Sequence, residues 1–182
     1  MSMHNLARLF VSAAAIAWVT ARAQESPKLG VVATPEQVAA FDVSIAPDGK
    51  GLPAGSGSAK QGRGLYEVQC MACHGKDGAG TPNDQLVGGR GTLRDASPVR
   101  TIGSYWPYAT TLFDYIRRAM PYVQPHSLAD ADVYALTAYL LYLNGVIGED
   151  DVMDAKTLPG VEMPNRDNFD WAYQDPARHG RR

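Results

Sequence analysis

The sequence is poor in cysteine, in surplus positive charge and in long apolar runs. Its 182 residues include only two cysteines, too few for a disulfide framework or a four-cysteine zinc site. Seventeen lysines and arginines stand against nineteen acidic residues, a formal net charge of -2, so no basic excess indicates nucleic-acid binding. The length favours one domain, and 45% hydrophobic with 20% charged residues is an ordinary globular composition.

The longest apolar run lies near the N-terminus. Leu9–Val19 comprises eleven residues interrupted only by Ser12, whereas a membrane-spanning helix needs about 18–20. Arg8 before the run and the A-x-A pattern of residues 21–23 after it are typical of a secretory signal peptide. We therefore predict that residues 1–23 are removed on export, with a short membrane anchor as the alternative, and that no later segment spans a membrane. The mature chain would work in the periplasm or outside the cell. In such an oxidising compartment the two thiols should be oxidised, metal-bound or covalently used.

Both cysteines belong to one motif. Residues 70–74 read CMACH, and C-x-x-C-H is the attachment sequence of c-type haem. On one helical turn the sulfurs of Cys70 and Cys73 lie on the same side and can form thioethers with one haem edge, while His74 ligates the iron. A thioredoxin-like pair would need a βαβ pattern, a zinc site would need two more ligands, and a plain disulfide leaves His74 without a role. We therefore predict one covalently bound haem c.

A helix is predicted to lead into this motif. Residues 58–61 read SAKQ, which is the capping-box pattern S-x-x-Q, and the helix would run from there to Cys70. Gly62 lies four residues before Tyr66 and eight before Cys70, on one helix face. Its missing side chain would let another helix approach closely.

Two further helices are predicted C-terminal to the motif. The apolar period of residues 111–119 indicates a helix that Pro121 terminates. A third helix follows a cap at Ser127 and stops at residues 144–145, Asn-Gly. It is apolar nearly all round, which indicates burial against both protein and haem. No strand of comparable length is expected, so the predicted fold is all-α, with helices wrapped around one cofactor.

A methionine is predicted as the sixth ligand of the iron. Met120 lies 46 residues after His74 and precedes a proline, which fixes an extended loop able to direct the sulfur inward. Met163 also precedes a proline and, with Met153 and His126, remains an alternative, as does an open position. A thioether ligand suits electron transfer, whereas an open position suits ligand binding or peroxide chemistry.

Side chains between the motif and Met120 are candidates for holding the haem propionates. Trp106 offers an indole N–H and is our first choice. The hydroxyls of Tyr105 and Tyr108 are alternatives. Guanidinium groups that could serve instead belong to Arg90, Arg94 and Arg100.

The haem helix, the Met120 loop and the closing helix together resemble a class I cytochrome c over residues 56–145. A more specific similarity, to SoxD-type cytochromes, lies in residues 103–121 (GSYWPYATTLFDYIRRAMP), 138–145 (AYLLYLNG), 153–159 (MDAKTLP) and 163–166 (MPNR). SoxD-type cytochromes are subunits of sulfane or sulfite dehydrogenases. The resemblance implies a class I cytochrome c fold, with Cys70 and Cys73 anchoring the haem and His74 and Met120 ligating its iron.

The resemblance also implies partners and an activity. A molybdenum-cofactor subunit of the sulfite oxidase type (SoxC-like) would oxidise the sulfur compound, and a further cytochrome c would receive the electrons. Some relatives carry a second haem module, whereas this chain has one attachment motif. The alternatives are a freestanding periplasmic electron carrier or the cytochrome subunit of another dehydrogenase. A haem enzyme or gas sensor with an open site is less favoured.

Four segments are predicted along the chain: a signal peptide (1–23), an irregular N-terminal arm (24–55), the cytochrome c domain (56–145) and an irregular C-terminal extension (146–182). Prolines and a weak helical period set the two arms apart. Such arms either wrap a partner or remain as loose termini. The acidic run at residues 149–154 either steers a basic partner or is simply solvated.

Overall fold

The computed structural model describes residues 29–169. These residues divide into two units between Asp42 and Val43. The predicted signal peptide, residues 1–23, lies outside the described range, as does the end of the predicted C-terminal extension. Among the helices that are described, none has the length and apolar character of a membrane span.

Over residues 29–42, the described part of the N-terminal unit, there is one helix, α2 (Pro35–Phe41). A capping box starts it: the Thr34 hydroxyl accepts a hydrogen bond from the Gln37 N–H, and the Gln37 side chain accepts one from the Thr34 N–H. Pro35 occupies the first turn, where its missing N–H costs nothing. The sequence predicts an irregular arm over residues 24–55, and α2 corrects that expectation in part, because local capping rather than an apolar period sets this helix.

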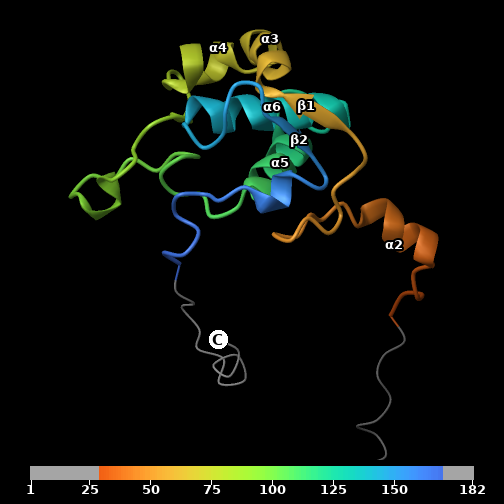
Figure 1. Ribbon diagram of the computed structural model, residues 1–182. Helices are drawn as coiled ribbons and strands as arrows, with labels where there is room; N and C mark the ends of the chain where they lie inside the picture. Colours follow the sequence, from red (N-terminus) through yellow and green to blue (C-terminus); the bar gives the residue numbers. More distant parts are fainter. Residues whose placement is uncertain (1–28, 170–182) are drawn as a thin grey trace, which may run out of the picture. The chain divides into compact units, whose positions relative to one another are not determined.

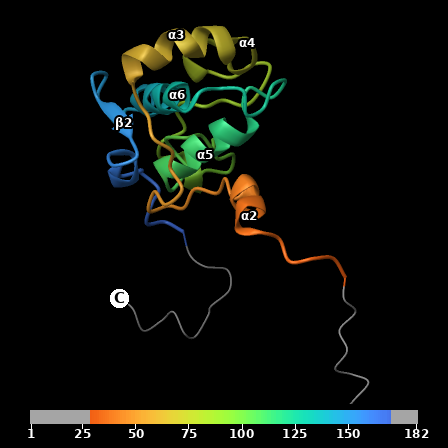
Figure 2. The same ribbon diagram turned by 90° about the vertical axis from the view of Figure 1, so that its right-hand side faces the viewer.

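The second unit contains four α-helices and three short 3-10 helices. Their bounds are α3 (Ala59–Gln69), α4 (Met71–His74), α5 (Ala109–Ala119), α6 (Asp130–Leu143), η1 (Lys76–Gly78), η2 (Thr92–Arg94) and η3 (Leu158–Gly160). Helix α6 lies between α3 and α5 in both views (Figures 1 and 2). Every residue from Val133 to Leu141 is buried, which confirms the predicted burial around its whole circumference.

Helices α3 and α6 cross at close range. The predicted capping box at Ser58 and Gln61 is present, and Cys70 caps the C-terminal end of α3. A Cβ on Gly62 would lie 2.0 Å from the Ala135 carbonyl oxygen of α6. Glycine is therefore required at this crossing, as the sequence predicts.

Helix α6 begins later than predicted. Its N-cap is Ala129, with no side-chain cap, so the expected cap at Ser127 is wrong. The Asp130 carboxylate instead accepts a hydrogen bond from Arg117 Nε at 2.8 Å, and an acidic residue in the first turn also complements the helix dipole. A tertiary ion pair thus replaces the local cap at this helix start.

Helix α5 begins at Ala109, two residues before the predicted start, and ends at Ala119 as predicted. Met120 then adopts an extended conformation, with φ -123° and ψ 145°. Pro121 excludes the helical region for the residue that precedes it. The chain therefore leaves the helix at the residue predicted to face the iron.

A two-stranded antiparallel sheet joins β1 (Ser56–Ser58) to β2 (Val152–Asp154) (Figure 1). The sequence signals no strand here because each has only three residues. Strand β2 brings part of the predicted C-terminal extension onto the domain. Three apolar side chains of this extension are buried in the core: Met153, Leu158 and Met163. Within the predicted irregular extension, residues 152–154 and 158–160 therefore form regular elements, and the rest of residues 146–169 contains neither helix nor strand.

Candidate functional site

The five predicted site residues line one cavity of the second unit. Its volume is about 620 Å³, and its wall includes Cys70, Cys73, His74, Trp106 and Met120. Apolar side chains from α5, α6 and the loop before α5 form much of the remaining wall: Ile102, Leu112, Ile116, Leu136 and Leu140. The cavity has the size and mainly apolar lining of a cofactor site.

The two cysteines lie one helical turn apart. The backbone N–H groups of Cys73 and His74 both donate to the Cys70 carbonyl, at 3.1 and 2.9 Å, which fixes the turn. Both thiols are free. Burial, with the neighbouring Cys73 as a smaller contribution, raises the pKa of the Cys70 thiol to about 11. Cys70 is therefore a neutral thiol on an apolar wall rather than a reactive thiolate.

The His74 imidazole has a defined orientation. Its Nδ1 lies 2.9 Å from the Asp84 carbonyl oxygen. A carbonyl only accepts hydrogen bonds, so Nδ1 donates one, and the Nε2 of the neutral imidazole is then the nitrogen that offers a lone pair. This arrangement is typical of a metal-ligating histidine whose other nitrogen is held by the protein.

The loop after the motif holds the motif in place. The Asn83 N–H donates to the Cys73 carbonyl at 2.9 Å, and the Gly80 N–H donates to the His74 carbonyl at 2.8 Å. Gly75 has a φ of 73°, and a Cβ there would lie 2.4 Å from the Gly80 carbonyl oxygen. The chain thus needs glycine directly after His74 in order to fold back over the turn.

Among the candidate sixth ligands, the structure brings only Met120 to the cavity. Met153 and Met163 are buried in the core at 5% and 3% exposure and do not belong to the cavity wall. His126 is exposed and also lies away from the wall. Met120 follows α5 and is partly buried against the core.

The propionate candidates separate into two groups. Trp106 lies on the cavity wall and packs edge-on against Tyr115, with ring centroids 5.7 Å apart. Arg100 also lies on the wall, and its guanidinium carbon is 5.6 Å from the ring centroid of Tyr105. The candidates that are not on the wall are Tyr105, Tyr108, Arg90 and Arg94.

Sequence reasoning missed several residues of the cavity wall, and three of them show why. Asp84 contributes a backbone carbonyl, and a backbone acceptor has no residue-type signature. Tyr122 and Val123 line the cavity although they are 83% and 86% exposed. Their position directly after the Met-Pro dipeptide was the available signal, because the loop that carries Met120 must also border the cavity.

The donor set fits a haem c. Two thiols one turn apart, an imidazole held through Nδ1 and a thioether meet on a mainly apolar wall. Thioether attachment needs the first pair, and axial ligation needs the imidazole and the thioether. The cavity therefore has the donors that a covalently attached haem requires.

Comparisons with known proteins indicate the family of the fold that carries this cavity. A family model described as cytochrome c oxidase, cbb3-type, subunit III matches residues 57–140. The crystal structure of the sulfane dehydrogenase SoxCD from Paracoccus pantotrophus matches with a TM-score of 0.74 and 41% sequence identity, over 85% of this chain and 75% of that chain. No match was found among curated proteins.

Fold and site together define a class I cytochrome c, a mostly helical protein with a small two-stranded sheet. The cofactor of that class is haem c. The chain belongs to the SoxD-type cytochromes.

Proposed function

We propose that this chain is the monohaem electron-transfer subunit of a periplasmic, molybdenum-dependent dehydrogenase of sulfur compounds. The observation that carries the proposal is the 41% identity to a chain of the sulfane dehydrogenase SoxCD. A SoxC-like molybdenum-cofactor subunit oxidises sulfane, sulfite or thiosulfate sulfur. This chain takes the electrons one at a time and passes them to a further cytochrome c.

Five side chains would hold the haem in this proposal. Cys70 and Cys73 would attach it covalently, His74 Nε2 and the Met120 sulfur would ligate its iron, and the Trp106 indole N–H would bind a propionate. The haem iron supplies a one-electron ferrous–ferric couple when bound.

The protein's own contribution is to orient the ligands and to exclude water. The Asp84 carbonyl fixes the tautomer of His74 and makes its imidazole a stronger donor. The extended backbone at Met120 presents a thioether, which raises the reduction potential relative to a second histidine. The apolar wall keeps the dielectric constant around the iron low, and this also tunes the potential.

The decisive experiment follows haem reduction in a mixture of purified components. The holo-cytochrome is mixed with the molybdenum subunit, and sulfite or thiosulfate is added while the visible spectrum is recorded. We expect rapid reduction with substrate and both proteins present, and none when the molybdenum subunit is omitted. If the substrate-reduced molybdenum subunit leaves this haem oxidised, the proposal is wrong. Reduction by another dehydrogenase would then favour the freestanding-carrier alternative.

Attachment and export have a separate test. Intact-mass measurement of protein from the periplasmic fraction should give a chain beginning at residue 24 and heavier by one haem. A Cys70→Ala, Cys73→Ala double variant should lose the covalent increment. A full-length mass, or a haem removable by acid and organic solvent from the unaltered chain, would contradict the predicted processing or attachment.

A further inference from the structure

Two buried tyrosines reach the loop that follows His74, and the proposed haem ligation does not use them. The Tyr66 hydroxyl on α3 donates to the Gly75 carbonyl at 2.9 Å. The Tyr139 hydroxyl on α6 donates to the Asp77 carboxylate at 3.2 Å. Their side chains are 1% and 2% exposed, and their ring centroids lie 5.5 Å apart. We name Tyr66 and Tyr139 the tyrosine pair.

The close crossing of α3 and α6 brings the pair together. Gly62, one turn before Tyr66, removes the side chain that would separate the helices. The Arg63 guanidinium lies 5.7 Å from the Tyr139 ring centroid, a cation–π distance. Burial raises the pKa of Tyr66 to about 12 and also shifts the pKa of Tyr139 upward from its ordinary value. Both hydroxyls therefore remain hydrogen-bond donors at any working pH.

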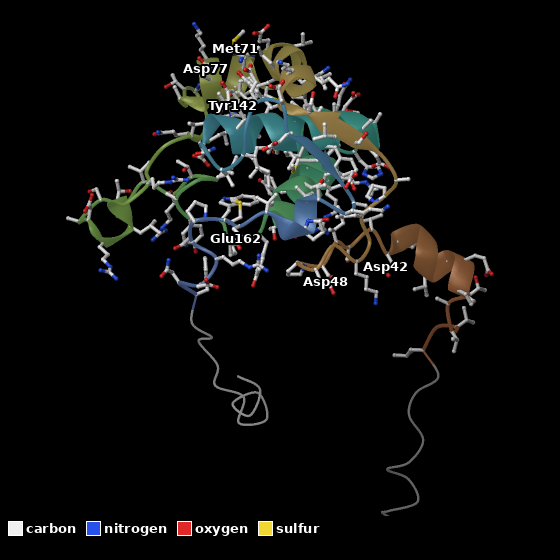
Figure 3. All side chains as sticks on the ribbon, viewed as in Figure 1. Asp42, Asp48, Met71, Asp77, Tyr142 and Glu162 are labelled. Carbon is white, nitrogen blue, oxygen red and sulfur yellow. The ribbon has the colours of Figure 1, made fainter. Side chains whose placement is uncertain are left out.

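The segment that the pair contacts has an unfavourable backbone conformation. Gly75, Asp77 and Gly78 have φ values of 73°, 52° and 75°. A non-glycine residue such as Asp77 pays about 1–2 kcal/mol in the left-handed region, so its position requires external contacts. Figure 3 shows Asp77 beside α4, at the same end of this unit as Met71. The hydrogen bond from Tyr139 supplies one such contact, on the short 3-10 helix η1.

From this segment the chain leads directly to the partner of the His74 ring. The Leu86 N–H donates to the Gly78 carbonyl at 2.9 Å, and Gly80 and Asn83 donate to the carbonyls of His74 and Cys73. Asp84 lies between these contacts, and its backbone carbonyl accepts a hydrogen bond from His74 Nδ1. The tyrosine pair thus holds one end of a loop, and the loop's other end orients the imidazole.

We propose that Tyr66 and Tyr139 are positioning residues for the axial histidine, acting through residues 75–84 to keep the Asp84 carbonyl against His74 Nδ1. The proposal rests on His74 being the haem ligand. A short Nδ1–H···O bond makes the imidazole a stronger donor and stabilises the ferric state. Loosening the loop weakens that bond, so losing a hydroxyl of the pair raises the reduction potential.

The chain offers a matched control for this proposal. Tyr134 on α6 is also fully buried, and its hydroxyl also donates to a backbone carbonyl, that of Pro53, at 2.9 Å. Tyr66→Phe and Tyr134→Phe each remove one buried tyrosine–carbonyl hydrogen bond of equal length. They differ in that only Tyr66 contacts the loop after His74.

The test measures the reduction potential of the isolated holo-cytochrome, the proton NMR shifts of the His74 ring and the midpoint of unfolding by guanidinium. We expect Tyr66→Phe and Tyr134→Phe to lower the midpoint to a similar extent. Only Tyr66→Phe should raise the potential and move the His74 resonances. Tyr139→Phe should act in the same direction with a smaller shift, because its hydrogen bond is longer. Asp77→Asn, which keeps an acceptor for Tyr139, should shift the potential less than Asp77→Ala.

Equal potentials for Tyr66→Phe, Tyr134→Phe and the unaltered protein would show that the pair is only part of the core. If Tyr66→Phe does not mature, Tyr139→Phe and the two Asp77 variants decide by the same readouts. None of these measurements needs the molybdenum subunit, so they decide the matter even if the proposed partner is wrong. An unaltered chain without haem would instead overturn the ligand assignment.

Discussion

The cytochrome domain is flanked by residues 29–42 and residues 146–169. The two segments are alike in that neither shows a long apolar period. The apolar side chains of the two segments differ in burial. Those of the C-terminal segment lie in the core, at 5%, 0% and 3% exposure for Met153, Leu158 and Met163. Those of the N-terminal segment are 96%, 96% and 88% exposed for Val31, Val32 and Phe41. Composition alone does not determine which segment becomes part of the domain.

The C-terminal segment makes contacts with residues far away in the sequence. Strand β2 pairs with β1, and the acidic run beside it contacts α3: Asp150 pairs with Lys60, and Glu149 with Arg63 at 3.0 Å. Part of the acidic run therefore has partners within the chain. Helix α2 instead satisfies its own end groups through its capping box. Its apolar residues Val38 and Phe41 are 53% and 88% exposed.

Truncation of a core side chain should separate the two segments most strongly. Leu158→Ala removes a fully buried side chain and should lower the free energy of unfolding by about 2–5 kcal/mol. Val32→Ala, at an exposed position, should change it by less than about 0.5 kcal/mol. Guanidinium titration of the holo-protein measures both. Similar losses for the two variants would show that the N-terminal segment is also buried in solution.

The two Met-Pro dipeptides sharpen the comparison. Met163→Ala should lower the free energy of unfolding by about 2–5 kcal/mol and leave the ferric spectrum unchanged, because Met163 is buried away from the cavity. Met120→Ala should alter the ferric spectrum and lower the reduction potential, since it removes the thioether from the cavity wall. An unaltered spectrum for Met120→Ala would favour an open site or another donor.

Much of the candidate site could be predicted because its chemistry fixes short spacings. Cys70, Cys73 and His74 must share one helical turn to serve one haem, so five consecutive residues suffice to indicate them. The capping box at Ser58 is likewise local, and the structure confirms it. Covalent and capping constraints are read within a few residues, which is the range over which sequence patterns are informative.

The remaining features depend on contacts between distant residues. The ion pair of Arg117 with Asp130 sets the start of α6, so Ser127 has the right residue type for a cap and no role as one. Met120 and Met163 are equivalent as dipeptides, and only the fold separates cavity wall from core. The Asp84 carbonyl has no side-chain signature at all. Three-dimensional packing, not residue type, decides each of these cases.

We predict that the exposed apolar residues of the N-terminal unit contact the dehydrogenase subunit proposed above. The match to SoxCD covers 85% of the chain, more than residues 43–182 make up, so it extends into this unit. Val38→Ser and Phe41→Ser together should weaken binding to the molybdenum subunit about tenfold, because apolar contacts of this kind contribute on the order of 1 kcal/mol each.

Val152→Ser is the matched control, since Val152 is 48% exposed and Val38 is 53% exposed. Titration calorimetry with the molybdenum subunit gives the affinities of the variants. If the control weakens binding as much as the N-terminal pair does, residues 29–42 have no special part in the interface.

The smallest effect concerns residues 43–53, which join the exposed segment to the core and are held by the Tyr134 hydrogen bond to Pro53. Burial, with smaller contributions from nearby carboxylates, raises the pKa of Tyr134 to about 12, whereas an unfolded tyrosine ionises near pH 10. Above pH 10 the unfolded state releases the Tyr134 proton before the folded state does, and this favours unfolding. The contribution of Tyr134 to the free energy of unfolding is therefore intact below pH 10 and disappears as pH rises towards 12. Tyr134→Phe should make the unfolding midpoint less sensitive to pH over that interval. The same slope of the midpoint against pH in both proteins would show that Tyr134 ionises freely in the folded state. It would also show that residues 43–53 are as loosely held as residues 29–42.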